Sequence, residues 1–139
     1  MAKVAKRILI ADDTEAMRKI LLTMLRGEEY EVVGEARDGQ QAIDMAQLLR
    51  PEIVFLDIEM PKMGGLEALG EIRKLLPETI VLMVTSHTQR DLVERAIAGG
   101  AVGYIVKPFS ASRVFAAIRA AVANQTLGGG DAAQSGPSE

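Results

Sequence analysis

Acidic residues follow two apolar segments of this sequence, and a lysine ends a third. Asp12 and Asp13 come directly after residues 7–11, Asp57 ends the run IVFLD, and Lys107 ends the run GYIVK. Carboxylate oxygens are the ligands that a hard divalent cation such as Mg²⁺ prefers. An aspartate can also act as a nucleophile toward phosphorus. Brought together, these side chains could bind a metal ion and accept a phosphoryl group.

The apolar segments themselves predict the scaffold. Five short runs are typical of strands, and they begin at Arg7, Glu31, Glu52, Thr79 and Ala101. At least three are almost continuously apolar, as in strands covered on both faces of a parallel sheet. Helical spacing between and after the runs predicts helices over residues 16–25, 40–49, 66–76, 88–98 and 114–122. The alternation predicts an α/β domain with a five-stranded, doubly wound parallel sheet.

The first helical pattern places six apolar residues on one face: Ala16, Met17, Ile20, Leu21, Met24 and Leu25. Because such a stripe normally faces the core, we expect this face of the helix to be buried. The pattern of elements stops after Asn124, so the sequence predicts a domain at 1–124 and a flexible tail or linker at 125–139.

Ligands of open α/β sheets bind beyond the carboxyl ends of the strands. At that edge we expect the acids Asp12, Asp13 and Asp57, the hydroxyl of Thr85 and the ammonium of Lys107. Clustered carboxylates repel one another unless a cation neutralises them, which favours bound Mg²⁺. Asp57 would then be the nucleophile, while the lysine and the hydroxyl would contact phosphoryl oxygens.

Each of these residues also has a purely structural interpretation. Asp12 followed by Glu15 could form a capping box for the first helix. Asp57 could be a turn residue before Pro61, and Lys107 could be a solvated lysine. Their convergence on one edge favours the chemical interpretation.

Composition excludes several function classes. The 139 residues carry a net charge of −3, which gives no electrostatic reason for direct nucleic-acid binding. The absence of cysteine excludes disulfides and thiolate chemistry, and His87 is the one histidine. Since no run suits a membrane span or a signal peptide, we expect a cytoplasmic protein without membrane insertion.

Four segments resemble the receiver domain of two-component response regulators. They are ILIADD, VFLDIEMPKMGGLEAL, VLMVTS and GYIVKPF, in that order, and the resemblance covers residues 6–122. It implies a flavodoxin-like fold with strand order 2-1-3-4-5. The longer stretch GYIVKPFSASRVFAAI resembles chemotaxis members of the family in particular.

The resemblance also implies roles at the acidic edge. Asp57 would accept a phosphoryl group from a phosphohistidine of a sensor histidine kinase. Asp12 and Asp13 would hold Mg²⁺ together with Asp57 and the backbone carbonyl of Glu59. Lys107 would contact the phosphoryl group.

A conformational switch follows from the same resemblance. Thr85 would be the switch hydroxyl, and Tyr104 the aromatic residue that turns inward when Thr85 moves. A downstream protein would bind the face formed by the fourth helix, fifth strand and fifth helix. The bond between Lys107 and Pro108 is often cis in this family. Gly64 stands where the family often has aspartate, so we expect altered loop stability without loss of chemistry.

Two further residues are expected to tune the lifetime of the phosphorylated form. Glu59 lies two residues beyond the acceptor, and His87 two beyond the switch threonine. We expect these side chains to attract each other and to shield the phosphoryl group from attacking water. In the alternative, Glu59 orients that water and shortens the lifetime.

Other functions remain open at this stage. DIE at Asp57 mimics the nucleophile of haloacid-dehalogenase phosphatases, although those enzymes place the nucleophile after the first strand. A flavin or nucleotide carrier would need a phosphate-cradling loop where this chain has ADDTEAM. The chain could also be a fragment of a longer DNA-binding or enzymatic response regulator. We expect a switch that catalyses only its own phosphorylation and dephosphorylation.

Overall fold

The computed structural model describes residues 5–27, 29–86 and 89–128. The strands are β1 (Lys6–Ala11), β2 (Tyr30–Ala36), β3 (Ile53–Leu56), β4 (Ile80–Thr85) and β5 (Gly103–Val106). The helices are α1 (Glu15–Leu25), α2 (Gly39–Leu49), α3 (Gly65–Leu75), α4 (Arg90–Ala98) and α5 (Ala111–Gly128). All strands pair in parallel in the order β2-β1-β3-β4-β5, which confirms the predicted fold.

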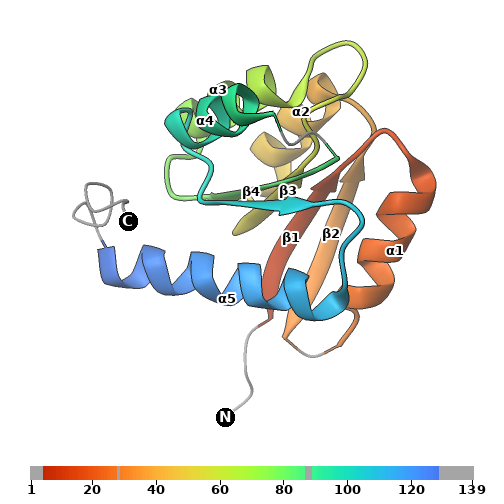
Figure 1. Ribbon diagram of the computed structural model, residues 1–139. Coiled ribbons are helices and arrows are strands. Elements are labelled where there is room, and N and C mark those ends of the chain that lie inside the picture. The colour runs from red at the N-terminus through yellow and green to blue at the C-terminus, as the bar shows by residue number, and fades with distance from the viewer. Residues whose placement is uncertain (1–4, 28, 87–88, 129–139) are drawn as a thin grey trace.

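Helices cover both faces of the sheet (Figure 1). One core lies between the sheet and α2, α3 and α4, and the other between the sheet and α1 and α5. Val54 belongs to the first core and its neighbour Phe55 to the second. Because successive residues of a strand point to opposite faces, both must be apolar here. This double burial explains the nearly continuous apolar runs of the central strands.

Helix α1 departs from the predicted apolar stripe. Ala16 is exposed and Ile20 is 44% exposed, whereas Arg18 is buried on the same face as Leu21 and Leu25. These three positions follow the spacing i, i+3, i+7 of one helical face. The apolar pattern therefore identified the helix and the burial of Leu21 and Leu25 correctly, but it included two exposed positions and missed Arg18.

Helix α5 is longer than expected. It runs from Ala111 through Gly128, past the boundary predicted at Asn124. Val114 and Ile118 are buried, whereas Val122 is only partly buried. Within the described ranges, no helix is both long and apolar enough to cross a bilayer.

Candidate functional site

Backbone ladders extend beyond three strands and fix the residues that follow them. The amide of Asp12 donates to Ala36 at 3.0 Å, and the amide of Asp57 donates to the carbonyl of Ala11 at 3.0 Å. The amide of Lys107 donates to Thr85 at 2.9 Å. Each functional side chain therefore starts from a backbone position that the sheet holds in place.

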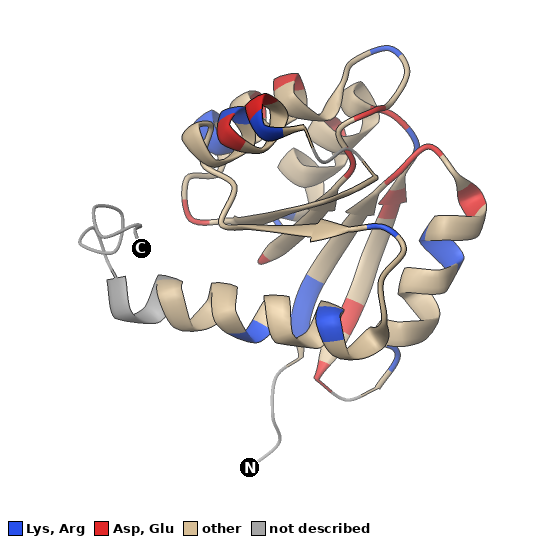
Figure 2. Cartoon of the chain, in the orientation of Figure 1, with Lys and Arg blue, Asp and Glu red and all other residues tan. Residues whose placement is uncertain are grey.

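The acids meet as predicted. Asp12, Asp13 and Asp57 each offer a carboxylate oxygen, and these oxygens lie within 4.8 Å of one another. Figure 2 shows acidic segments in the loops at this end of the sheet and a basic segment just after β5. Asp12 and Asp57 are buried, while Asp13 is exposed. An all-oxygen donor set that is open to water on one side fits Mg²⁺, which retains several waters when bound.

Lys107 links two of the acids. Its Nζ donates to Asp12 Oδ2 at 2.7 Å and to Asp57 Oδ2 at 3.2 Å. Burial alone would lower the pKa of Lys107, but its bond to Asp12 and the charges of Asp57 and Asp12 outweigh this and raise the pKa. Three carboxylates against one ammonium leave an excess of two negative charges. One divalent cation would balance that excess.

The surroundings of Asp57 disfavour the ionised form of its carboxyl group. Burial raises the pKa of Asp57 above its ordinary value, and the charge of Asp12 adds to the rise. Lys107 and a hydrogen bond with Thr85 lower the pKa but do not cancel the rise. The amide of Glu59 also donates to Asp57 Oδ1, at 3.4 Å. The fully buried Thr85 therefore reaches the acceptor carboxylate before any phosphoryl group is present.

Asp57 opens onto a hollow of about 590 Å³ at the surface. Its lining comes from four loops: Asp13, Thr14, Asp57, Glu59, Met60, Pro61, Ser86 and Lys107. A small phosphodonor or a protruding side chain of a partner could enter this hollow. The side chain of Glu59 is exposed at its rim.

The glycine pair after the acceptor has a packing role. A side chain at Gly65 would overlap the backbone carbonyl of Asp57, so only glycine allows α3 to begin so close to the site. The amide of Gly65 donates to Ile58 at 2.7 Å and closes this turn. Gly64 is the N-cap of α3 and makes no side-chain capping bond. Aspartate in its place could make that bond, in line with the expected effect on loop stability.

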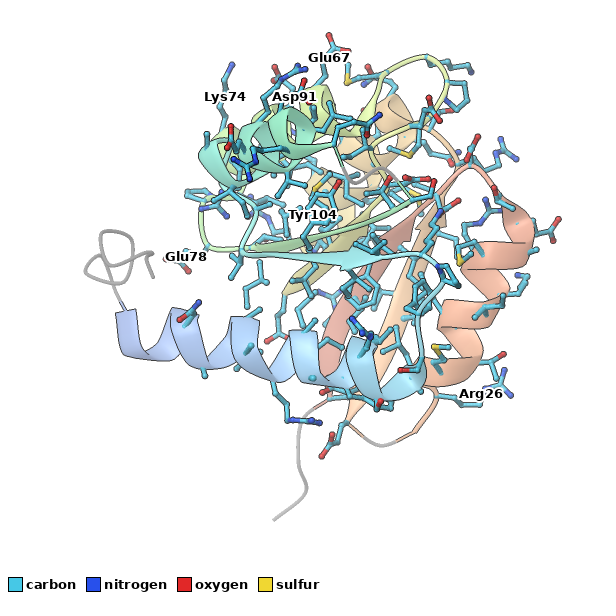
Figure 3. All side chains as sticks on the ribbon, viewed as in Figure 1. Arg26, Glu67, Lys74, Glu78, Asp91 and Tyr104 are labelled. Carbon is cyan, nitrogen blue, oxygen red and sulfur yellow. The ribbon has the colours of Figure 1, made fainter. Side chains whose placement is uncertain are left out.

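Tyr104 lies within electrostatic reach of the acceptor. It packs against the core shared by α2, α3 and α4, and Figure 3 shows it on the α4 side of β5. Burial, and then the charge of Asp57, raise the pKa of Tyr104. The Lys107–Pro108 bond is cis, as expected. His87 lies outside the described residues, so its pairing with Glu59 stays a prediction.

Two polar residues near the acids escaped the sequence analysis. The capping box of Asp12 with Glu15, the alternative structural interpretation, is not formed, because Thr14 is the N-cap and makes no side-chain capping bond. Asp12 Oδ1 instead accepts from the amide of Thr14 at 2.9 Å. Arg18 Nη1 donates to the backbone carbonyl of Asp12 at 2.7 Å. Its position three residues before Leu21, on the buried side of α1, was the available signal.

Comparisons with known proteins agree with this geometry. The transcriptional regulatory protein PdtaR of Mycobacterium tuberculosis is 46% identical over 123 residues, which cover 87% of this chain and 58% of that protein. This chain thus spans little more than half the length of that relative. Chemotaxis protein CheY of Thermotoga maritima is 42% identical over 113 residues, with 81% of this chain and 94% of that protein covered.

Solved structures show the same fold. A CheY-like receiver domain protein from Methanospirillum hungatei has a TM-score of 0.83 at 28% identity, covering 90% of this chain and 99% of that one. CheY in the CheX-CheY-BeF3-Mg²⁺ complex from Borrelia burgdorferi has a TM-score of 0.80 at 28% identity, covering 84% and 89%. The family model of the response regulator receiver domain matches residues 8–119. The chain therefore belongs to the response regulator receiver domains, the signalling switches of two-component systems.

Proposed function

We propose that this receiver domain accepts a phosphoryl group on Asp57 in a Mg²⁺-dependent reaction and is activated by it. The observation that carries the proposal is the bridge from Lys107 to both Asp57 and Asp12, at 3.2 and 2.7 Å, beside a third carboxylate. A buried carboxylate that faces a cation and an open hollow is suited to be a nucleophile. The Borrelia burgdorferi CheY structure with BeF3 and Mg²⁺ supports the same ligand chemistry here.

In the reaction, a carboxylate oxygen of Asp57 attacks the phosphorus of a phosphohistidine on a sensor histidine kinase. The oxygen–phosphorus bond forms as the phosphorus–nitrogen bond breaks, and the imidazole nitrogen keeps the electron pair. Lys107, now at 3.2 Å from Asp57, would donate to a phosphoryl oxygen. Positioning and charge stabilisation supply most of the catalysis in phosphoryl transfer.

The acidic residues would hold the metal. Asp12, Asp13 and Asp57, with the backbone carbonyl of Glu59, are the proposed ligands. Bound Mg²⁺ would neutralise charge that develops on the phosphoryl oxygens. Because Asp13 is exposed, the site stays open to water and to the donor.

Activation would begin at Thr85. Phosphorylation adds roughly −1.5 to −2 charges, which draw the Thr85 hydroxyl further toward the acceptor. Tyr104 would fill the vacated space and change the face of α4, β5 and α5. That face carries two exposed apolar residues, Ile97 at 49% and Val106 at 41%. We propose that a downstream protein binds there.

The chain itself would turn over no other substrate. Membership in the receiver family counts against a haloacid-dehalogenase phosphatase and a flavin carrier. One relative, the protein-glutamate methylesterase of Pyrococcus horikoshii, is 44% identical over 107 residues, but these make up 29% of that protein. The named relatives are a transcriptional regulatory protein and a chemotaxis protein, and the output proposed for this chain is binding to a downstream protein.

The test is phosphorylation with acetyl phosphate and Mg²⁺, followed by intact mass. Wild type should gain one phosphate that hydroxylamine removes, and Asp57→Asn should gain none. Asp38→Asn is the matched control, because Asp38 is as buried as Asp57 but caps α2. An Asp57→Asn protein that gains the same mass would refute the acceptor assignment. Sustained hydrolysis of a phosphomonoester by wild type would favour the phosphatase.

A further inference from the structure

Arg18 is a buried charge with no part in the proposed phosphoryl chemistry. It lies near the start of α1 and is 8% exposed. Burying a guanidinium costs free energy unless its donors are satisfied and its charge is paired. The groups that satisfy it therefore indicate what the residue does.

The guanidinium bridges two segments at the acidic edge. Nη1 donates to the backbone carbonyl of Asp12 at 2.7 Å, and Nε donates to Glu35 Oε1 at 3.0 Å. Glu35 lies on β2, directly before the residue whose carbonyl accepts from the amide of Asp12. The side chain of Arg18 and the β1–β2 ladder thus close a ring around Asp12.

This ring fixes the peptide that joins the acidic pair. The amide of Asp12 donates to Ala36, and its Oδ1 accepts from the amide of Thr14 at 2.9 Å. The Asp12 carbonyl that Arg18 holds belongs to the planar peptide between Asp12 and Asp13. A bond to that oxygen therefore sets the direction in which Asp13 leaves β1.

We propose that Arg18, oriented by Glu35, is a positioning residue for the pair Asp12 and Asp13, and that tight Mg²⁺ binding depends on it. The inference rests on the proposed function, because it takes Mg²⁺ to be the ligand of these acids. Groups that orient metal ligands from outside typically change metal affinity by 10- to 100-fold. At Asp12, Arg18 bonds the backbone carbonyl and not the carboxylate that would bind the metal, so we expect an effect of about tenfold, at the low end of that range.

Positioning and simple electrostatics predict opposite signs. Arg18 is a cation beside a cation site, so loss of its charge alone would tighten Mg²⁺ binding. Loss of the anchored peptide would weaken it. Lys19 provides a matched control, because its Nζ pairs with the same Glu35 at 3.3 Å and is 54% exposed. Among the described residues Lys19 has no hydrogen bond to Asp12.

The experiment is calorimetric titration of the whole chain with MgCl₂ at neutral pH, without any phosphodonor. Arg18→Met keeps the apolar stem and should raise the Kd about tenfold. Lys19→Met should bind as wild type does or slightly more tightly. Glu35→Ala, which frees the guanidinium without touching Asp12, should weaken binding severalfold. Amide chemical shifts of Asp13 and Thr14 should change in the Arg18 and Glu35 variants and stay unchanged in Lys19→Met.

Three results would overturn the inference. The first is an Arg18→Met Kd equal to or below that of wild type. The second is equal weakening in Lys19→Met, because both variants remove a charge paired with Glu35. If circular dichroism shows Arg18→Met to be unfolded, Glu35→Ala decides, and a wild-type Kd there is the third. Failure of wild type to bind Mg²⁺ would overturn the proposed function itself, which separates the two failures.

Discussion

Replacing Asp57 by asparagine should stabilise the fold when no divalent cation is present. Burial raises the pKa of the Asp57 carboxyl, and Lys107 and Thr85 offset that rise only in part. A group whose pKa is higher in the folded than in the unfolded state disfavours folding wherever it is ionised. The acceptor is therefore held ready for chemistry at a cost in free energy of unfolding.

The size of this cost follows from the distances. With an effective dielectric constant of about 20, the charges of Asp12 and Asp57, which lie within 4.8 Å of each other, repel by at least about 3.5 kcal/mol. Attraction to Lys107 at 3.2 Å is about 5 kcal/mol on the same scale. Attraction and repulsion are thus of similar size, and the desolvation of a buried carboxylate, several kcal/mol, decides the sign. Asparagine at position 57 removes all three contributions, while the ion pair of Lys107 with Asp12 remains. We therefore expect the free energy of unfolding to increase by about 1–2 kcal/mol.

Urea denaturation with a metal chelator present measures this gain. The difference in free energy of unfolding between Asp57→Asn and wild type should be largest at neutral pH. It should vanish as the pH falls below the ordinary carboxyl pKa of 3.8. Saturating Mg²⁺ should narrow it by stabilising wild type. Asp38→Asn is again the control and should be nearly neutral, because asparagine also caps a helix well. A less stable Asp57→Asn protein at neutral pH, or a gap indifferent to acid, would refute the reasoning.

Two other variants test the switch and the lifetime. Thr85→Ala should still accept phosphate, but phosphorylation should change its conformation less, because the variant lacks the hydroxyl that bonds Asp57. Phosphorylation-induced chemical shifts around Tyr104 equal to those of wild type would contradict this coupling. Glu59→Ala should lose phosphate faster than wild type, since the exposed carboxylate at the rim of the hollow is proposed to shield phosphorus together with His87. A slower loss, followed by intact mass over time, would instead favour Glu59 as the group that orients water.

The fold was readable from sequence because the central strands are buried on both faces. Val54 and Phe55 serve opposite cores, so the apolar run has no polar interruptions and identifies a parallel sheet. The acids were predictable because parallel strands deliver their carboxyl ends to one edge. The end of α5 was not, because a shift in composition after Asn124 does not stop a helix, which here runs on to Gly128.

The apolar periodicity of the sequence did not predict the side-chain networks of the site. Arg18 occupies a core-facing position of α1, and apolar periodicity does not register a buried arginine that is paired and hydrogen-bonded. The double contact of Lys107 depends on a partner 95 residues earlier in the chain. Such contacts depend on the folded geometry of three separate loops, so no local spacing encodes them.

Lys107 also couples the binding of the two ligands expected at this site, the divalent cation and the phosphoryl group. Its ammonium contacts carboxylate oxygens of Asp12 and Asp57, at 2.7 and 3.2 Å. Both residues belong to the acidic cluster that would bind the cation. It is thus a built-in competitor of any external cation. A phosphoryl group on Asp57 would offer the ammonium new oxygens and free the carboxylate of Asp12. By thermodynamic reciprocity, whatever factor the phosphoryl group adds to cation affinity, the cation must add to the affinity for a phosphoryl analogue.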